Sequence, residues 1–271
     1  MTKVKQTQLL LLSVAAVVFV LLYIAPKRSD SPKEKQGETK SSITTFANIE
    51  SFVKTAGGML APELKTQHDA LFNKQSFDSL IKFWDKAKRP DIASYYFEKT
   101  AAKSNSALNW FKAGDRYYYS IRFIKDVNEI PALYQSAMRC YESGLKLEPK
   151  NVDGQIMLAA CYVEGSQDPM KGITMLREVE KTDSNNIKLQ LNFAFFSAKS
   201  QQWDKAIARF QKVLKIDPNY IEAYLHLADA YEQQGDKAKT IEMLEKYVSI
   251  TNDADAAQEI KKYIQQLKAE Q

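Results

Sequence analysis

Side chains that commonly catalyse reactions or bind metals are few and scattered in this sequence. The histidines are His68 and His226, and the cysteines are Cys140 and Cys161. A structural zinc site needs four ligands at close spacing, which these residues do not have. The sequence also lacks a phosphate-binding loop, a G-x-S-x-G nucleophile elbow and an H-E-x-x-H zinc motif. We therefore expect no enzyme activity, no metal and no cofactor.

One stretch is rich in aromatic and basic side chains. Residues 114–137 read GDRYYYSIRFIKDVNEIPALYQSA, in which three consecutive tyrosines lie between Arg116 and Arg122. Such residues suit base stacking, cation–π contacts and ordinary helix cores equally well. The elements around the stretch must decide between these possibilities.

The composition favours an all-α protein. The chain has 271 residues, of which 45% are apolar, and it contains only nine glycines and eight prolines. Turn formers are thus scarce, and the helix formers Ala, Leu, Lys, Glu and Gln are abundant.

The positive charge of the chain is unevenly distributed. The formal net charge is +5, and residues 74–125 hold eleven basic against five acidic side chains. This basic segment lies among neutral or acidic ones.

An apolar run near the N-terminus is long enough to cross a membrane. Residues 9–25 carry no charge and have lysine or arginine on both sides. As a helix they span about 25 Å, the lower limit for a bilayer crossing. The alternative is a cleaved signal peptide, but bulky Tyr23 and the proline after Ala25 do not suit a cleavage site. We predict an N-terminal tail at 1–8 and a transmembrane helix at 9–25.

Residues 26–42 are predicted to form a flexible linker, because residues 27–42 contain no large apolar side chain to bury. Large domains cross membranes largely regardless of their charge. We therefore expect a single-pass protein of the bacterial inner membrane, with its folded domain on the exported, periplasmic side.

The second half of the chain contains an internal repeat. Residues 187–220 and 221–254 are both 34 residues long and align without a gap. In the second copy, apolar and small residues mark the faces of two helices on either side of a turn at Gly235-Asp236: Tyr224, Leu227, Ala228, Tyr231, Leu244 and Tyr247. A repeat of this length indicates stacked helix pairs.

The pattern resembles the tetratricopeptide repeat, in which small residues let two antiparallel helices approach and large ones fill the layer between repeats. The resemblance implies an α-solenoid of antiparallel helix pairs. It extends over five repeats: 74–106, 107–151, 152–186, 187–220 and 221–254. Residues 43–73 read as a helical cap or a degenerate repeat, broken at Gly57-Gly58. Residues 255–271 read as a C-terminal capping helix.

The same resemblance implies a function. In that family the first helix of each pair lines a concave groove that binds a peptide or helix of a partner protein. Ten residues at groove positions, and Arg122 one turn after Tyr118, are the candidate partner-binding residues: Phe111, Asp115, Tyr118, Tyr119, Arg122, Ile156, Lys188, Leu191, Phe195, Lys199 and Asp229. The alternative is that some of them pack beneath neighbouring helices. His226 is predicted to lie at a solvent-facing or groove-edge position.

The repeat at 107–151 is longer than its neighbours. Two positions that are nine residues apart in a regular repeat are here Tyr117 and Ala137, so that eleven residues are inserted. The apolar face continues through Ile121 and Ile124, and Pro131 can begin the second helix early. We expect a lengthened helical pair in which Tyr117 packs in the core. The insertion could serve either binding or architecture.

The sequence as a whole predicts a non-enzymatic, membrane-anchored scaffold or adaptor that binds a protein partner, for example during assembly of an envelope complex. The alternative is a binder of anionic lipid or a polyanion through residues 74–125. No nucleic acid and no small-molecule substrate are expected.

Overall fold

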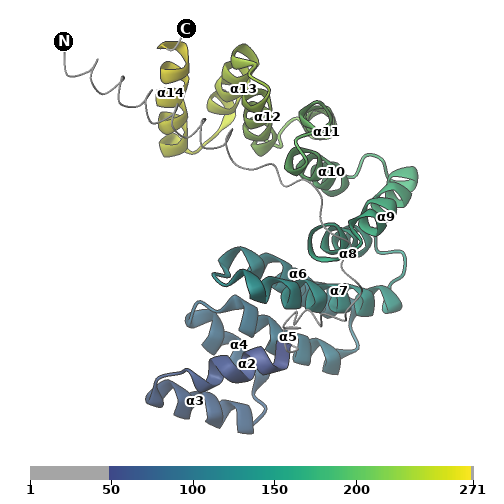
Figure 1. The fold of residues 1–271 in the computed structure, drawn as a ribbon, viewed down its shortest axis with the longest axis vertical. Helices are drawn as coiled ribbons and strands as arrows, with labels where there is room; N and C mark the ends of the chain where they lie inside the picture. The colour runs from purple at the N-terminus through teal and green to yellow at the C-terminus, as the bar shows by residue number, and fades with distance from the viewer. Residues whose placement is uncertain (1–48, 270–271) are drawn as a thin grey trace, which may run out of the picture. The chain divides into compact units, whose positions relative to one another are not determined.

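The computed structural model describes residues 49–269, and this part of the chain is entirely helical. It contains thirteen α-helices and two short 3-10 helices (Figure 1). The predicted tail, membrane segment and linker at 1–42 lie outside the described residues. Within 49–269, no helix has the length and apolar character needed to span a bilayer.

Ten of these helices form five consecutive antiparallel pairs. The pairs are α4 (Phe77–Lys86) with α5 (Pro90–Ser104), α6 (Ala107–Ser120) with α7 (Ile130–Leu147), α8 (Val152–Gly165) with α9 (Pro169–Thr182), α10 (Ile187–Lys199) with α11 (Trp203–Ile216), and α12 (Glu222–Gln233) with α13 (Lys237–Ile250). Each helix packs on the next along the chain, which is the arrangement of a solenoid. The all-α prediction is therefore confirmed.

Short polar side chains begin several of these helices. Asn151, Asp168, Asn186 and Asp236 each accept a hydrogen bond from a backbone N–H in the first turn of the helix that follows. These bonds satisfy N–H groups that have no partner inside the helix. Before Asp236, Gly235 takes φ of 78°, a left-handed conformation that glycine adopts without strain. The predicted turn at this position is thus present.

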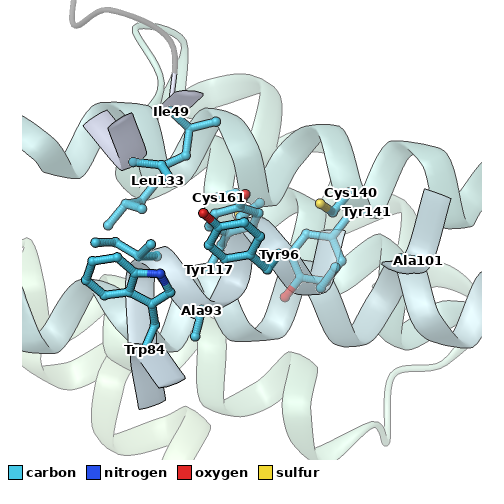
Figure 2. Close-up of a cluster of buried hydrophobic side chains, with 14 of the residues drawn as sticks. Ile49, Trp84, Ala93, Tyr96, Ala101, Tyr117, Leu133, Cys140, Tyr141 and Cys161 are labelled. Atoms are coloured by element: carbon cyan, nitrogen blue, oxygen red, sulfur yellow. The ribbon is translucent and has the colours of Figure 1, made fainter. Parts of the chain in front are cut away.

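Three buried tyrosines, Tyr96, Tyr117 and Tyr141, lie in the largest core, which extends from α2 to α8 (Figure 2). Tyr117 is completely buried, as predicted, and its hydroxyl donates to Glu98 Oε2 at 2.7 Å. Tyr96 and Tyr141 are each 1% exposed, and burial raises the pKa of Tyr96 to about 12. Tyr117 therefore packs in the core and cannot contact a partner. Of the three consecutive tyrosines, only Tyr118 and Tyr119 are exposed enough to do so.

The inserted residues lengthen one helix of their pair rather than both. Helix α7 has 18 residues, with Pro131 in its first turn, whereas α9, α11 and α13 have 14 each. Helix α6 ends at Ser120 and is followed by the 3-10 helices η1 (Ile121–Phe123) and η2 (Val127–Glu129). Ile121 and Ile124 still pack on the core from this irregular segment. The predicted extension of the first helix is wrong, because Ile121 and Ile124 reach the core as partly buried side chains without continuing the helix.

Separate helices occupy the two ends of the described chain. Helices α2 (Ile49–Gly58) and α3 (Pro62–Asn73) precede the pairs, and His68 is the buried residue of α3. At the other end, α14 (Ala254–Ala269) packs on α13 and buries Ile264. The stacking face of the last pair is therefore covered.

Candidate partner-binding groove

A groove of about 850 Å³ lies between the end of α6, the helices α8 and α10, and the connection from α11 to α12. Its lining includes six of the eleven predicted site residues: Tyr118, Tyr119, Arg122, Lys188, Leu191 and Phe195. Three different repeats thus contribute to one surface.

One side of the groove is an aromatic and acidic cluster. The ring centroids of Tyr118 and Tyr119 are 5.5 Å apart in an edge-to-face arrangement. The Tyr118 hydroxyl donates to Glu164 Oε2 at 2.6 Å, and Tyr134 donates to the same oxygen at 3.4 Å. Burial, together with the Glu164 carboxylate, raises the pKa of Tyr118 far above its ordinary value. Tyr118 therefore remains a hydrogen-bond donor that positions Glu164.

Phe195 forms the apolar centre of the opposite side. It is 43% exposed, and its ring meets Phe210 and His226 edge to face at centroid distances of 5.5 and 4.9 Å. His226 in turn stacks on Phe210 at 5.1 Å. His226 therefore contacts the groove residue Phe195 and is half-buried between aromatic rings, which corresponds to the groove-edge alternative of its prediction. Burial also lowers the pKa of His226.

The basic residues of the groove differ in their partners. Lys188 on α10 pairs with Asp153 on α8. Arg122 holds its guanidinium carbon 5.2 Å from the centroid of the Tyr119 ring. Within residues 49–269, Arg122 forms no ion pair. The positive charge of Arg122 is therefore available at the α6 end of the groove.

Two further predicted residues point mainly into the protein. A Cβ atom added to Gly144 or Gly154 would lie 2.5 or 2.6 Å from Phe111 Cε1, so Phe111 fills the space between α7 and α8. Asp115 accepts a hydrogen bond from the Tyr141 hydroxyl at 2.7 Å, and burial raises the pKa of Asp115. Both line a smaller cavity of about 270 Å³ that shares Lys188 with the groove.

The other three predicted residues lie outside the groove lining. Ile156 is completely buried in a core with Leu176 and Leu189, so its assignment to the groove is corrected. The reason is that α8 is covered by both α9 and α10. Lys199 lies 3.7 Å from Glu164, at the rim, and Asp229 is exposed on α12.

The sequence patterns did not single out several residues that line the groove. Examples are Met157, Phe196 and Tyr220. Tyr220 lies in the connection before α12, outside the helix whose positions define the family groove. No sequence signal could have placed it there, because its position depends on contacts between repeats.

The basic residues of segment 74–125 are spread over α4, α5, α6, η1 and the connections around them. Arg89, Lys99 and Arg116 pair with carboxylates of Asp91, Glu50 and Asp85. Part of the charge of the segment is therefore neutralised within the protein.

Known family models match the last helix pairs of the chain. Residues 198–235 match the family described as TPR repeat, and residues 221–253 match the one described as tetratricopeptide repeat. Residues 198–253 of the chain therefore consist of tetratricopeptide repeats. Its groove-lining helices α6, α8 and α10 are the first helices of three successive repeats.

Two curated proteins share a part of this repeat protein. The cytochrome c-type biogenesis protein CcmH of Escherichia coli (strain K12) is 30% identical over 84 residues, which are 30% of this chain and 24% of CcmH. The protein of the same name from Shigella flexneri matches equally. The match therefore spans about a quarter of the length of these relatives.

Several solved structures are similar at lower identity. YrrB, described as a TPR protein with an unusual peptide-binding site, is 21% identical, with a TM-score of 0.43 over 72% of this chain and 96% of YrrB. PilW, described as a type IV pilus biogenesis factor, is 17% identical, with a TM-score of 0.49 over 71% of this chain and 89% of PilW. MamA from Desulfovibrio magneticus RS-1 is 17% identical, with a TM-score of 0.46 over 66% and 95% of the two chains.

Proposed function

We propose that this TPR protein is a non-enzymatic adaptor that binds a segment of a protein partner in the groove between α6, α8 and α10. The observation that carries the proposal is the exposure of Phe195 beside Leu191 in a groove of about 850 Å³. Large apolar side chains in a concave surface with a polar rim are typical of peptide- and helix-binding sites.

Residues 9–25 support a membrane-anchored form of this adaptor. Their uncharged run is long enough for a bilayer crossing and is flanked by basic residues. We place the repeats on the periplasmic side of a bacterial inner membrane, where the adaptor would hold its partner during assembly of an envelope complex. The local similarity to a protein named for cytochrome c-type biogenesis is in keeping with such a role.

The alternative, binding of anionic lipid or a polyanion through residues 74–125, has weaker support. Three of its basic residues already pair with carboxylates of the protein, as described above. The remaining basic side chains belong to several helices rather than to one defined site.

Partner binding is tested by quantitative cross-linking of the tagged full-length chain in cells. Phe195→Glu places a charge at the centre of the groove, and we expect at least a tenfold loss of the cross-linked partners. Met170→Glu is the matched control, because Met170 is 59% exposed on α9 and does not line the groove. An unchanged set of partners in a folded Phe195→Glu variant contradicts the proposal.

The side of the membrane is tested separately with C-terminal reporter fusions. Activity of an alkaline phosphatase fusion, without fluorescence of a matching cytoplasmic reporter, is the expected result. The opposite pattern places the repeats in the cytoplasm and leaves the groove proposal intact.

A further inference from the structure

We infer that the face formed by α3 and α4 rests on the surface of an anionic lipid bilayer. The inference rests on the membrane-anchored form of the proposed function and adds a second contact with the membrane. This face lies at the N-terminal end of the row of helices and leaves the groove between α6, α8 and α10 free for the partner. Its exposed apolar residues precede residue 74, so the surface differs from the basic segment 74–125 taken as a whole.

The N-terminal end of the solenoid carries a cluster of exposed apolar side chains. Figure 1 shows α2 and α3 at one end of the row of helices and α14 at the other. Met59, Leu64 and Phe72 are 80%, 46% and 51% exposed, and all three belong to α3 or to the turn before it. Terminal repeats of solenoids normally turn a polar face to water, so an apolar end is typical of an interaction surface.

A cavity of about 530 Å³ between α3 and α4 continues this surface. Leu64, Leu71 and Phe83 give the cavity an apolar floor. His68, which is 7% exposed, stacks on Phe72 at a centroid distance of 6.1 Å and meets Phe83 at 5.8 Å. The two phenylalanine rings are therefore held in place by a buried residue of α3.

The rim of the cavity is basic. Lys82 and Lys86 line it one helical turn apart on α4, and among the described residues no acidic side chain lines it. Within 49–269, neither lysine forms an ion pair. Asp85, which lies between them in the sequence, pairs instead with Arg116 on α6. An anionic partner would therefore complete this rim.

The charges favour lipid headgroups over a second copy of the chain. If two copies met through this face, their lysines would oppose one another, which disfavours the contact. Glu63 and Asp78, the acids of α3 and α4 that form no ion pair within the described residues, do not line the cavity. Bulky apolar side chains beside lysines are typical of surfaces that lie in the headgroup layer, where each lysine is attracted to anionic lipid.

The proposed anchor keeps this end of the chain close to the bilayer. Residues 26–48 separate the uncharged run at 9–25 from α2, and a stretch of this length reaches at most about 80 Å when fully extended. Confinement to this distance raises the local concentration of the face at the membrane. A weak surface contact is then sufficient for docking.

The test uses the full-length chain in nanodiscs of phosphatidylcholine alone or of equal parts phosphatidylcholine and phosphatidylglycerol. A fluorophore on Gln67→Cys, in the cavity lining, reports contact with lipids that carry a quencher in their acyl chains. The same fluorophore on Lys261→Cys, exposed on α14, is the control label. The native Cys140 and Cys161 are completely buried, so they should not react with the fluorophore.

We expect the label on Gln67→Cys to be quenched in the mixed nanodiscs and much less in phosphatidylcholine alone or at high salt. Lys82→Gln with Lys86→Gln should lower the ratio of docked to undocked protein at least about tenfold, because each lysine contributes to attraction by anionic lipid. The matched control is Lys261→Gln with Lys262→Gln, two exposed lysines of α14, which should leave the quenching unchanged.

The contrary results are distinct from one another. Quenching at Gln67 no stronger than at Lys261, or unaffected by loss of Lys82 and Lys86, shows that the face does not lie on anionic lipid. Shielding of the label that follows the number of chains per nanodisc, whatever the lipid, assigns the face to a second copy. Either result overturns the inference and leaves the adaptor proposal intact. If the full-length chain does not stay in nanodiscs, its membrane-anchored form fails and the inference fails with it.

Discussion

At the scale of single residues, the side of the groove around Phe195 is built from aromatic contacts that disfavour a charged imidazole. His226 packs against Phe210 and Phe195, and burial lowers its pKa while the charges of Asp229 and Glu222 oppose this effect. A neutral imidazole therefore suits the folded protein. The exposed edge of Phe195 depends on this packing for its position.

Acid should therefore weaken the fold through His226. The unfolded chain takes up a proton near pH 6.5, whereas the folded His226 does so only at lower pH, so stability is lost as the pH falls from about 6.5. We expect the drop in Tm between pH 7 and pH 5 to be smaller for His226→Phe than for the wild type, measured by circular dichroism. Equal drops in the two proteins would show that His226 does not titrate differently on folding.

At the scale of helices, each pair relies on close approach at small residues. A Cβ atom added to Gly172 on α9 would lie 2.4 Å from the carbonyl oxygen of Ala159 on α8. A backbone atom cannot move aside as the end of a flexible side chain can. The two helices of this pair therefore require glycine at this contact.

Gly172→Ala should lower the free energy of unfolding by about 1–3 kcal/mol, since the added methyl group overpacks the α8–α9 contact. The control is Gly58→Ala at the end of α2, where a Cβ meets no atom within 4 Å. This change should be neutral or stabilising by less than about 1 kcal/mol. Urea titration followed by circular dichroism measures both, and similar effects of the two substitutions would refute the steric explanation.

At the scale of the described chain from 49 to 269, the core is divided into four clusters that follow one another along the repeats. The last cluster joins α12, α13 and α14, where Ile264 packs with Ala228, Ile241 and Leu244. Each repeat thus depends chiefly on its neighbours, as in other solenoids. A destabilising substitution at one end should therefore unfold the adjacent repeats and leave the distant ones folded.

Ile264→Ala should destabilise the C-terminal end by about 2–5 kcal/mol, the usual effect of truncating a buried isoleucine. We expect faster amide hydrogen exchange in α12 to α14 and little change in α4 to α9. Lys261→Ala, at an exposed position of the same helix, is the control. Uniform loss of protection along the whole chain would show that the repeats unfold as one unit.

The predictions from sequence succeeded where local pattern decides the outcome. The repeat length, the turn at Gly235 and the burial of Tyr117 all follow from helical periodicity and from residue size. They failed for Ile156, because the exposure of a helix face depends on helices from other repeats. The first helix of the 107–151 repeat also ended earlier than its apolar pattern suggested.

The sequence by itself determined that the chain is helical, repetitive and without an evident catalytic motif, because composition and periodicity are local properties. Only the tertiary structure decided which side chains form the groove, since Tyr118, Glu164 and Phe195 come from three different repeats and line one surface through helix packing. It also decided which charges are already paired. Lys188 on α10, for example, pairs with Asp153 on α8, and no sequence pattern records that arrangement.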